Sequence, residues 1–390
     1  MLEFACPSPD RTVTGSGAVP RNSRQRRNRT MTSTSSAARH PTTHTARRRR
    51  RRWRHGGAIA ATTALAFASS IAPPLTSALP AAEASPVPGA PPEDGSMPPP
   101  GANDWSCEPT AEHPRAVVLV HGTYSNQDTW NAMSPALKAE GFCVFTLNYG
   151  RDLSSVAGRI PGYFATADIA ESAGQLAEFV DRVLAATGTV RVDMVAHSQG
   201  APMSRQYLRF NGGTNAQDPT QNKVLHLITI SGTNHGTTIS GLTNLVAGNQ
   251  LAVDLVEPVV GEATVQQLAG SRFITHLNAD GDTQPGVHYT AIGDEVDLVS
   301  TPPEATFLTA GPGATVRNVW VQSLCPDDTT RHGRMPFDPA AIFIVLSTLS
   351  PGYADTHQVT CPAPDPSSLP IPVSLPIPAP TPVAAAVPGR

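Results

Sequence analysis

The 390-residue chain has few lysines, few aromatic side chains and little charge. Lys138 and Lys223 are its only lysines, aromatic residues make up 5% of the chain, and charged residues make up 15%. From Ser85 onward, 28 acidic residues stand against 14 basic ones. Proteins that bind nucleic acid through its phosphates need a basic surface, which this part of the chain does not offer. The composition therefore argues against nucleic acid as a partner.

The chain also lacks an apolar run of about 20 residues, the length that a transmembrane helix needs. Residues 56–72 form a shorter, alanine-rich apolar run, and the preceding residues 47–55 are strongly basic. A basic stretch, a short apolar run and an A-x-A site are typical of a secretory signal peptide. We expect residues 1–84 to be leader and signal peptide, cleaved after Ala84 or, alternatively, after Ala78, and the mature protein to be secreted. Export by the twin-arginine route and a polybasic arm that binds membrane or nucleic acid are the competing interpretations.

Cysteine is scarce as well. Beyond residue 84 the chain has four cysteines, and this part of the chain has neither a Cys-x-x-Cys nor a His-x-x-x-His pair that would indicate a zinc site. Four cysteines allow three disulfide connectivities. Proximity in sequence favours Cys107–Cys143 and Cys325–Cys361, and an exported protein favours disulfides over free thiols. We expect two disulfides and no metal site.

Two proline-rich segments, residues 85–103 and 362–390, have no pattern that would build a core. We expect them to be a linker and a disordered tail. The residues between them, 104–361, are enough for one well-buried domain.

Short apolar runs alternate with helical patterns along this domain. Residues 115–120 are nearly all apolar, as in a parallel strand that is covered on both faces. Residues 168–187 carry apolar side chains at helical spacing, with Asp168 and Glu171 as capping residues. We expect further strands over residues 142–147, 190–196, 224–230, 287–293 and 315–322, and further helices over residues 130–140, 200–210 and 338–350. This alternation predicts an α/β fold with a mostly parallel, doubly wound sheet flanked by helices.

A nucleophile-elbow pattern, Ala196-His197-Ser198-Gln199-Gly200, lies between a predicted strand and a predicted helix. In such an elbow the serine occupies a strained turn, so the residues two before and two after it must be small. Ala196 replaces the commoner glycine and meets the same steric demand. The pattern predicts that Ser198 is a catalytic nucleophile, and a serine that only caps the helix is the structural alternative.

A second turn, His121-Gly122-Thr123, follows the first predicted strand and supports this interpretation. Acyl transfer needs N–H donors for the oxyanion that forms in the transition state. We expect the backbone N–H groups of Thr123 and Gln199 to supply them. His121 and His197 precede or flank the two turns, and we interpret them as structural hydrogen-bonding residues rather than as the base.

The chain resembles the secreted bacterial class 2 lipases in the segments Asn103–Cys107, HPRAVVLVHGT, GFCVFTLNYG, VAHSQG and TISGTNHGT. The resemblance covers residues 104–361. It implies an α/β-hydrolase fold, a Ser–Asp–His triad, carboxylic-ester substrates and no cofactor.

The triad order in this fold is serine, acid, histidine. After the strand predicted over residues 287–293, Asp294 and Asp297 compete as the acid, and the family pattern of an aspartate followed by apolar residues and a proline fits Asp297. The base follows the last predicted strand, where we expect His332, with His357 as the alternative. In this assignment His332 takes the serine proton and Asp297 orients the imidazole.

Two further segments have simpler interpretations. We expect His235 to shape the acyl pocket, and residues 278–282 to form a polar turn rather than a calcium loop.

The predicted function is hydrolysis of triacylglycerols or related acyl esters through an acyl-enzyme, by a monomer in transient contact with a lipid interface. The alternatives are an esterase for small soluble esters, an acyltransferase with the same triad, and a non-catalytic surface-binding protein.

Overall fold

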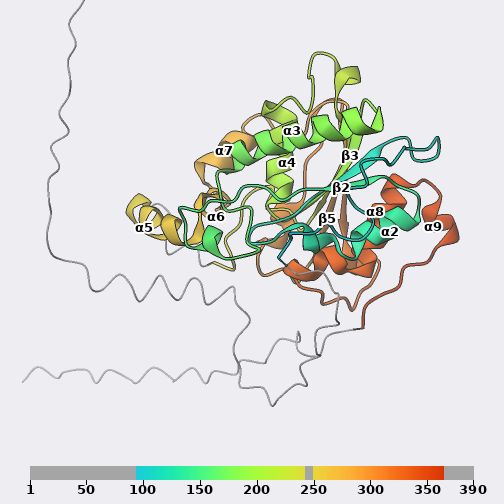
Figure 1. Cartoon of the computed structure of the whole chain (residues 1–390). Coiled ribbons are helices and arrows are strands. Elements are labelled where there is room, and N and C mark those ends of the chain that lie inside the picture. The colour runs from blue at the N-terminus through green and yellow to red at the C-terminus, as the bar shows by residue number, and fades with distance from the viewer. Residues whose placement is uncertain (1–93, 242–248, 364–390) are drawn as a thin grey trace, which may run out of the picture. The chain divides into compact units, whose positions relative to one another are not determined.

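The structure, a computed structural model, describes residues 94–241 and 249–363, so the expected signal peptide lies outside the described residues. Within these residues, six parallel strands form one sheet in the order β2-β1-β3-β4-β5-β6 (Figure 1). The strands are β1 (Ala116–Val120), β2 (Val144–Thr146), β3 (Val192–His197), β4 (Val224–Ile230), β5 (His288–Gly293) and β6 (Thr315–Trp320).

The strand order reverses once. The chain begins in β1, adds β2 on one side, and then places β3 to β6 in sequence on the other side. Such a reversal is where α/β sheets place their ligand sites, at the carboxyl ends of the strands. Every residue of β1 and β3 is buried, because helices cover both faces, and this explains the continuous apolar sequence of β1. β3 also buries Asp193, which is paired with Arg115 at 2.8 Å. The predicted parallel, doubly wound α/β fold is confirmed, and its topology is that of an α/β-hydrolase.

Helices cover the two faces of the sheet (Figure 1). The helices on one face are α3 (Ile169–Thr187), α4 (Gly200–Phe210) and α7 (Arg272–Asn278), and those on the other are α2 (Met133–Ala139), α8 (Pro339–Leu349) and α9 (Tyr353–Thr356). Each face has its own hydrophobic cluster. A fully buried leucine, isoleucine or valine in these clusters contributes about 1.5–3 kcal/mol relative to its exposed state.

The long helix α3 shows how local sequence sets an element. Asp168 precedes it, and its side chain accepts a hydrogen bond from the Glu171 backbone N–H, as the capping pair predicts. Gly188, with φ 67°, ends the helix in the left-handed conformation that glycine adopts without strain. One apolar face of the helix is fully buried, and it consists of Ile169, Ala173, Leu176, Val180 and Val183.

Two features differ from the predicted elements. Residues 130–140 were expected to be one helix, but the chain forms a 3-10 helix, η1 (Gln127–Trp130), followed by α2. Pro135 explains the break, because proline is tolerated only in the first turn of a helix. Helices α5 (Gln250–Val260) and α6 (Glu262–Gln266) lie with α7 between β4 and β5, and none of these three, nor α9, was predicted. The remaining 3-10 helices are η2 (Ala157–Arg159), η3 (Pro219–Gln221), η5 (Pro303–Thr306), η6 (Val321–Ser323) and η7 (His332–Phe337).

The proline-rich segment before the domain is packed against it from Asp94 onward, although the sequence analysis places the domain boundary at residue 104. The Gly95 carbonyl accepts hydrogen bonds from Gln127 Nε2 at 2.8 Å and from Asn148 Nδ2 at 2.7 Å. The Asn103 side chain donates to the Thr146 carbonyl and accepts from the Thr146 N–H, both at 2.9 Å. The composition of this segment does not predict its packing, because the contacts that hold it are polar rather than apolar.

Both predicted disulfides, Cys107–Cys143 and Cys325–Cys361, are present. The first joins the segment before β1 to the residue just before β2, and the second joins the residues after η6 to the residues after α9. No helix in the described part of the chain is long and apolar enough to span a membrane.

The segment between Asp94 and Asn103 is expected to stabilise the domain. We predict that a chain that begins at Asp104 is less stable than one that begins at Asp94, by about 3–5 kcal/mol, since each hydrogen bond contributes about 1 kcal/mol and the buried Gln127 amide loses its partner. Urea unfolding of the two chains, both ending at Arg390, measures the difference. Equal midpoints with equal slopes would contradict the prediction.

Candidate active site

Ser198 occupies the turn between β3 and α4. Its φ is 54°, in the left-handed region that residues other than glycine rarely adopt. Such a conformation costs about 1–3 kcal/mol and persists only where the surroundings hold it. Here the Ser198 backbone N–H donates to the Ile230 carbonyl at the end of β4, at 3.0 Å. The backbone conformation is therefore the one that the elbow pattern predicts.

Two glycines let this turn approach the end of β1. A Cβ at Gly200 would lie 2.5 Å from the Val120 carbonyl oxygen, and a Cβ at Gly122 would lie 2.7 Å from Ser198 Cβ. Both distances are far inside van der Waals contact, so neither position accepts a side chain unless the backbone moves. The small residue expected after the serine is thus required by the neighbouring strand.

Ser198, His332 and Asp297 lie together at the carboxyl edge of the sheet. His332 Nε2 is 2.9 Å from Ser198 Oγ, and His332 Nδ1 is 2.7 Å from Asp297 Oδ2. All three residues are buried. Asp297 lies in the loop after β5, and His332 begins η7 after β6. His357, the alternative base, is exposed and stacks on Tyr353.

The Asp297 contact determines the tautomer of a neutral His332. A carboxylate can only accept, so Nδ1 carries the hydrogen in the contact with Asp297. The neutral ring then has its lone pair on Nε2, where it can accept the hydrogen bond of the Ser198 hydroxyl. This order of donors and acceptors is the one in which a serine proton can pass to the imidazole.

Asp297 is held in its charged form. Its Oδ1 accepts from the backbone N–H groups of Val299 at 2.7 Å and Ser300 at 2.9 Å. Burial alone raises the pKa of this carboxyl, but the His332 imidazole and the two N–H donors outweigh burial, and the pKa lies below its ordinary value.

Asp294, the competing acid, has different surroundings. Its Oδ1 accepts from Gln322 Nε2 at 2.8 Å and from the Val296 N–H at 3.1 Å. The residue is buried, and burial raises the pKa of its carboxyl to about 6. Of the two aspartates, Asp297 is the one whose carboxylate contacts His332.

His121 and His197 make the structural contacts that the sequence analysis expected. His121 Nδ1 donates to the Gly122 carbonyl at 2.9 Å, and its ring stacks on Tyr149. His197 Nε2 donates to the His332 carbonyl at 2.9 Å, so it holds the backbone of His332 in place. Burial lowers the pKa of His121 to about 4 and that of His197 to about 3, which keeps both rings neutral at neutral pH.

The turn with Thr123 lies beside Ser198 through the close approach of Gly122, and Gln199 directly follows the serine. A residue that the sequence did not predict to be part of the site, Gln267, supports this turn. Gln267, just after α6, donates through Nε2 to Thr123 Oγ1 at 2.8 Å and accepts from Thr233 Oγ1 at 3.0 Å. No motif contains Gln267, because its position depends on the fold of α5 and α6.

The described part of the chain contains no group of three or more His, Cys, Asp or Glu side chains arranged to hold a metal ion. Within residues 278–282, the Asp282 carboxylate is occupied by protein groups: it accepts from the Thr309 N–H at 2.7 Å and contacts His235 Nε2 at 2.9 Å. His235 also contacts the Ala305 carbonyl, so it lies in a polar cluster of its own.

The close contact at Gly200 leads to a prediction. We expect Gly200→Ala to destabilise the protein by about 3 kcal/mol or more, because the new methyl group meets the backbone of β1. Gly174→Ala is the matched control: it lies inside α3 with nothing within 4 Å of the new methyl group, and it should stabilise the protein by about 1 kcal/mol. Thermal unfolding of both variants tests this, and a Gly200→Ala protein as stable as the parent would contradict it.

Solved structures that are similar to this chain include two lipases and a thioesterase. Aspergillus fumigatus lipase B aligns over 70% of this chain and 58% of its own length, with 19% identity and a TM-score of 0.48. Bacillus licheniformis lipase BlEst2 aligns over 62% of this chain and 94% of its own, with 15% identity and a TM-score of 0.43. This chain thus spans little more than half the length of the Aspergillus lipase.

The thioesterase RedJ of Streptomyces coelicolor aligns over 68% of this chain and 97% of its own, with 14% identity and a TM-score of 0.37. The family model described as lipase (class 2) matches residues 114–340. Since this match spans more than half of the sequence and includes both turns at the carboxyl edge of the sheet, the chain belongs to the class 2 lipase family.

Proposed function

We propose that the protein is a serine hydrolase that cleaves carboxylic esters through an acyl-enzyme. The observation that carries the proposal is the continuous chain of hydrogen bonds from Ser198 Oγ through the His332 ring to the Asp297 carboxylate. A buried serine in a strained turn, with an imidazole nitrogen at 2.9 Å, is the arrangement that activates a hydroxyl for attack on a carbonyl carbon.

In the first half-reaction, Ser198 Oγ attacks the ester carbonyl while His332 Nε2 accepts the hydroxyl proton. The resulting imidazolium faces the Asp297 carboxylate, whose lowered pKa keeps it negative and able to stabilise that charge. His332 then returns the proton to the leaving alcohol, and the acyl group remains on Ser198.

The negative oxygen of the tetrahedral intermediate needs donors that are already in place. We assign the backbone N–H groups of Thr123 and Gln199 to this role. Two contacts support the assignment: Gly122 lies against Ser198, and Gln267 holds the Thr123 side chain. The N-terminus of α4, directly after Gln199, adds a favourable dipole.

Water completes the reaction in a hydrolase, and an alcohol completes it in an acyltransferase. In both cases His332 takes a proton from the incoming hydroxyl, so the two activities use the same residues. Product analysis with a competing alcohol distinguishes them, and only the hydrolase releases free acid as its main product.

We infer that the substrates are acylglycerols or related acyl esters and that the protein contacts a lipid surface during turnover. Large apolar side chains are exposed on both sides of the proposed acid: Val296 at 40%, Leu298 at 56% and Val299 at 40%. Leu251 and Leu255 of α5 are exposed as well. Hydrolysis of an ester series from short to long acyl chains, measured below and above the solubility limit, tests this inference. Turnover confined to dissolved short-chain esters would favour an esterase for small soluble substrates.

We also infer that the protein is exported. The support is the predicted signal peptide together with two disulfides, since disulfides persist in oxidising compartments and are rare in the cytosol.

The first catalytic prediction concerns Ser198. Ser198→Ala should reduce ester hydrolysis by several orders of magnitude, because it removes the nucleophile and leaves the small side chain that the turn accepts. Its thermal midpoint should stay close to that of the parent. Parent-like turnover of a soluble ester by a purified variant would refute the assignment.

The second prediction ranks the two aspartates. Asp297→Asn should lower kcat by about 10⁴, because the amide allows the wrong imidazole tautomer and does not stabilise the imidazolium, by analogy with the serine-protease variant that defines this effect. Asp294→Asn should cost less than about tenfold, the equivalent of about 1.4 kcal/mol.

Stability provides a second readout of the same pair. The raised pKa of Asp294 means that its ionisation above about pH 6 costs stability in the folded state, and the amide removes that cost. Asp294→Asn should therefore unfold at the same or a higher temperature than the parent at pH 8. The reverse order of the two kcat values would move the acid to Asp294.

A further inference from the structure

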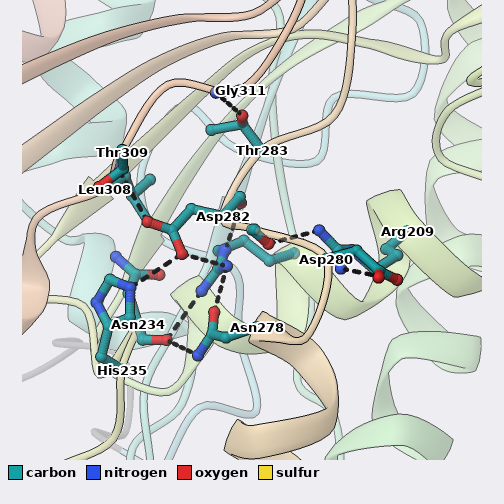
Figure 2. Close-up of polar contacts among 12 residues, drawn as sticks. Arg209, Asn234, His235, Asn278, Asp280, Asp282, Thr283, Leu308, Thr309 and Gly311 are labelled. Carbon is teal, nitrogen blue, oxygen red and sulfur yellow. Dashed lines mark hydrogen bonds and ion pairs between the residues drawn. The ribbon is translucent and has the colours of Figure 1, made fainter.

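A second polar cluster lies behind the loop that carries Asp297. We call residues 294–309 the acid loop. Its last part is bonded at three points to the segments that follow β4 and precede β5: Ala305 O to His235 Nδ1 at 2.9 Å, Thr306 O to Asn234 Nδ2 at 2.8 Å, and Thr309 N to Asp282 Oδ2 at 2.7 Å. Figure 2 shows the contact between Thr309 and Asp282.

The first part of the acid loop is fixed by the same segment after β4. Ser300 Oγ donates to the Ser231 carbonyl at 2.7 Å, and the Thr238 N–H donates to the Thr301 carbonyl at 2.8 Å. Asp297 therefore lies in a loop that is bonded on both sides of it to the residues after β4. Among the contacts that join the acid loop to the segments after β4 and before β5, those of His235 and Asp282 involve charged groups.

His235 has an acceptor at each ring nitrogen. Nδ1 faces the Ala305 carbonyl and Nε2 faces Asp282 Oδ1, both at 2.9 Å. A carbonyl and a carboxylate can only accept, and a neutral imidazole carries one N–H. Both hydrogen bonds exist together only when the ring is doubly protonated, so this geometry requires an imidazolium.

The charged groups around His235 come from three parts of the chain besides its own segment: the residues before β5, helix α4 and η5. Asp282 and Asp280 lie in the segment before β5, where Asp282 also contacts the buried Arg205 of α4 at 3.5 Å and Asp280 contacts Arg209 of α4 at 3.9 Å. Glu304 is the charged residue of η5, and η5 makes its contact with His235 through the Ala305 carbonyl.

Arg205 holds this arrangement together. Its guanidinium donates to the Asp282 carbonyl at 3.0 Å, the Asn234 carbonyl at 2.9 Å and Asn278 Oδ1 at 2.6 Å. Figure 2 labels these three partners. Arg205 therefore fixes the position of Asp282, and Asp282 in turn faces the His235 ring.

His235 is accessible to solvent protons. Its side chain is 36% exposed and lines an open cavity of about 660 Å³, together with Arg209, Phe210 and the residues around Gly311. The Asp282 carboxylate raises the pKa of His235 despite partial burial and the opposing charge of Arg205. The ring is thus a titratable group that can respond to the pH of the surroundings.

We propose that His235, as an imidazolium held by Asp282, is a positioning residue that ties the acid loop in the geometry that presents Asp297 to His332. The proposal deepens the proposed ester hydrolysis and rests on it. Loss of the proton leaves one N–H for two acceptors, so the ring gives up either the Ala305 carbonyl or the Asp282 carboxylate.

The stabilisation of the acid loop by His235 should decrease as the pH rises. A raised histidine pKa in the folded state means that the stabilisation is complete below the unfolded value of about 6.5 and is lost as the pH rises through the folded pKa. The acid loop should therefore loosen on the alkaline side.

Asp282→Asn provides the sharpest test. The new amide can accept from the Thr309 N–H through its oxygen and donate to a neutral His235 through its nitrogen, so it satisfies the ring without the second proton. His235→Gln removes the titrating group, and His357→Gln, at an exposed histidine that stacks on Tyr353, is the matched control.

Two measurements read the result. NMR titration of the histidine ring protons, with His235 assigned from the spectrum of His235→Gln, gives its pKa without any activity assay. We expect a value above 6.5 in the parent and a lower one in Asp282→Asn. The pH profile of kcat on a soluble ester should fall about three- to tenfold on the alkaline side in the parent and in His357→Gln, and stay flat in both cluster variants.

A parent His235 that titrates at or below 6.5, or a kcat profile that is the same in His235→Gln and the parent, would overturn the proposal. If Asp282→Asn does not fold, because Arg205 loses its counter-ion, the parent titration and His235→Gln still decide. A protein that does not hydrolyse esters but still shows the raised His235 pKa would instead refute the proposed function. The ion pair between His235 and Asp282 would then still stand.

Discussion

Ser198 holds a left-handed backbone conformation because three strands surround it, and the rest of the site is arranged around that turn. β4 accepts its N–H, β1 comes so close that Gly200 and Gly122 have no room for a methyl group, and β3 delivers it to the carboxyl edge of the sheet. The strain of about 1–3 kcal/mol is small beside the burial that these strands provide. The turn exposes the hydroxyl on the side where the loops after β5 and β6 meet.

The two neighbouring aspartates show how partners, rather than burial, set the state of a carboxyl. Asp294 and Asp297 are both almost fully buried, and burial raises the pKa of each. Only Asp297 has an imidazole and two close backbone N–H groups, which together lower its pKa below the ordinary value. A single residue therefore combines a dry environment with a stable negative charge, which is what stabilisation of an imidazolium requires.

Most of the site depends on hydrogen bonds between segments that are distant in sequence. His197 holds the His332 carbonyl, Gln267 holds Thr123, and the residues after β4 hold the acid loop on both sides of Asp297. The proposed nucleophile, base and acid come from three different loops, so their distances are set by these contacts. Rigid loops of this kind supply the preorganisation on which electrostatic catalysis depends.

The sequence by itself predicted the strands, the principal helices and the nucleophile candidate Ser198, because periodicity and small-residue spacing are local properties. Proximity in sequence favoured the two disulfides that the structure contains, and the resemblance to a lipase family favoured Asp297 and His332. Tertiary structure decided which aspartate meets His332, since Asp294 and Asp297 follow the same strand and differ only in the path of the loop. It also decided the packing of residues 94–103, the role of Gln267 and the paired acceptors of His235, none of which has a local pattern. These features arise from polar contacts across the fold, and hydrophobic periodicity carries no information about them.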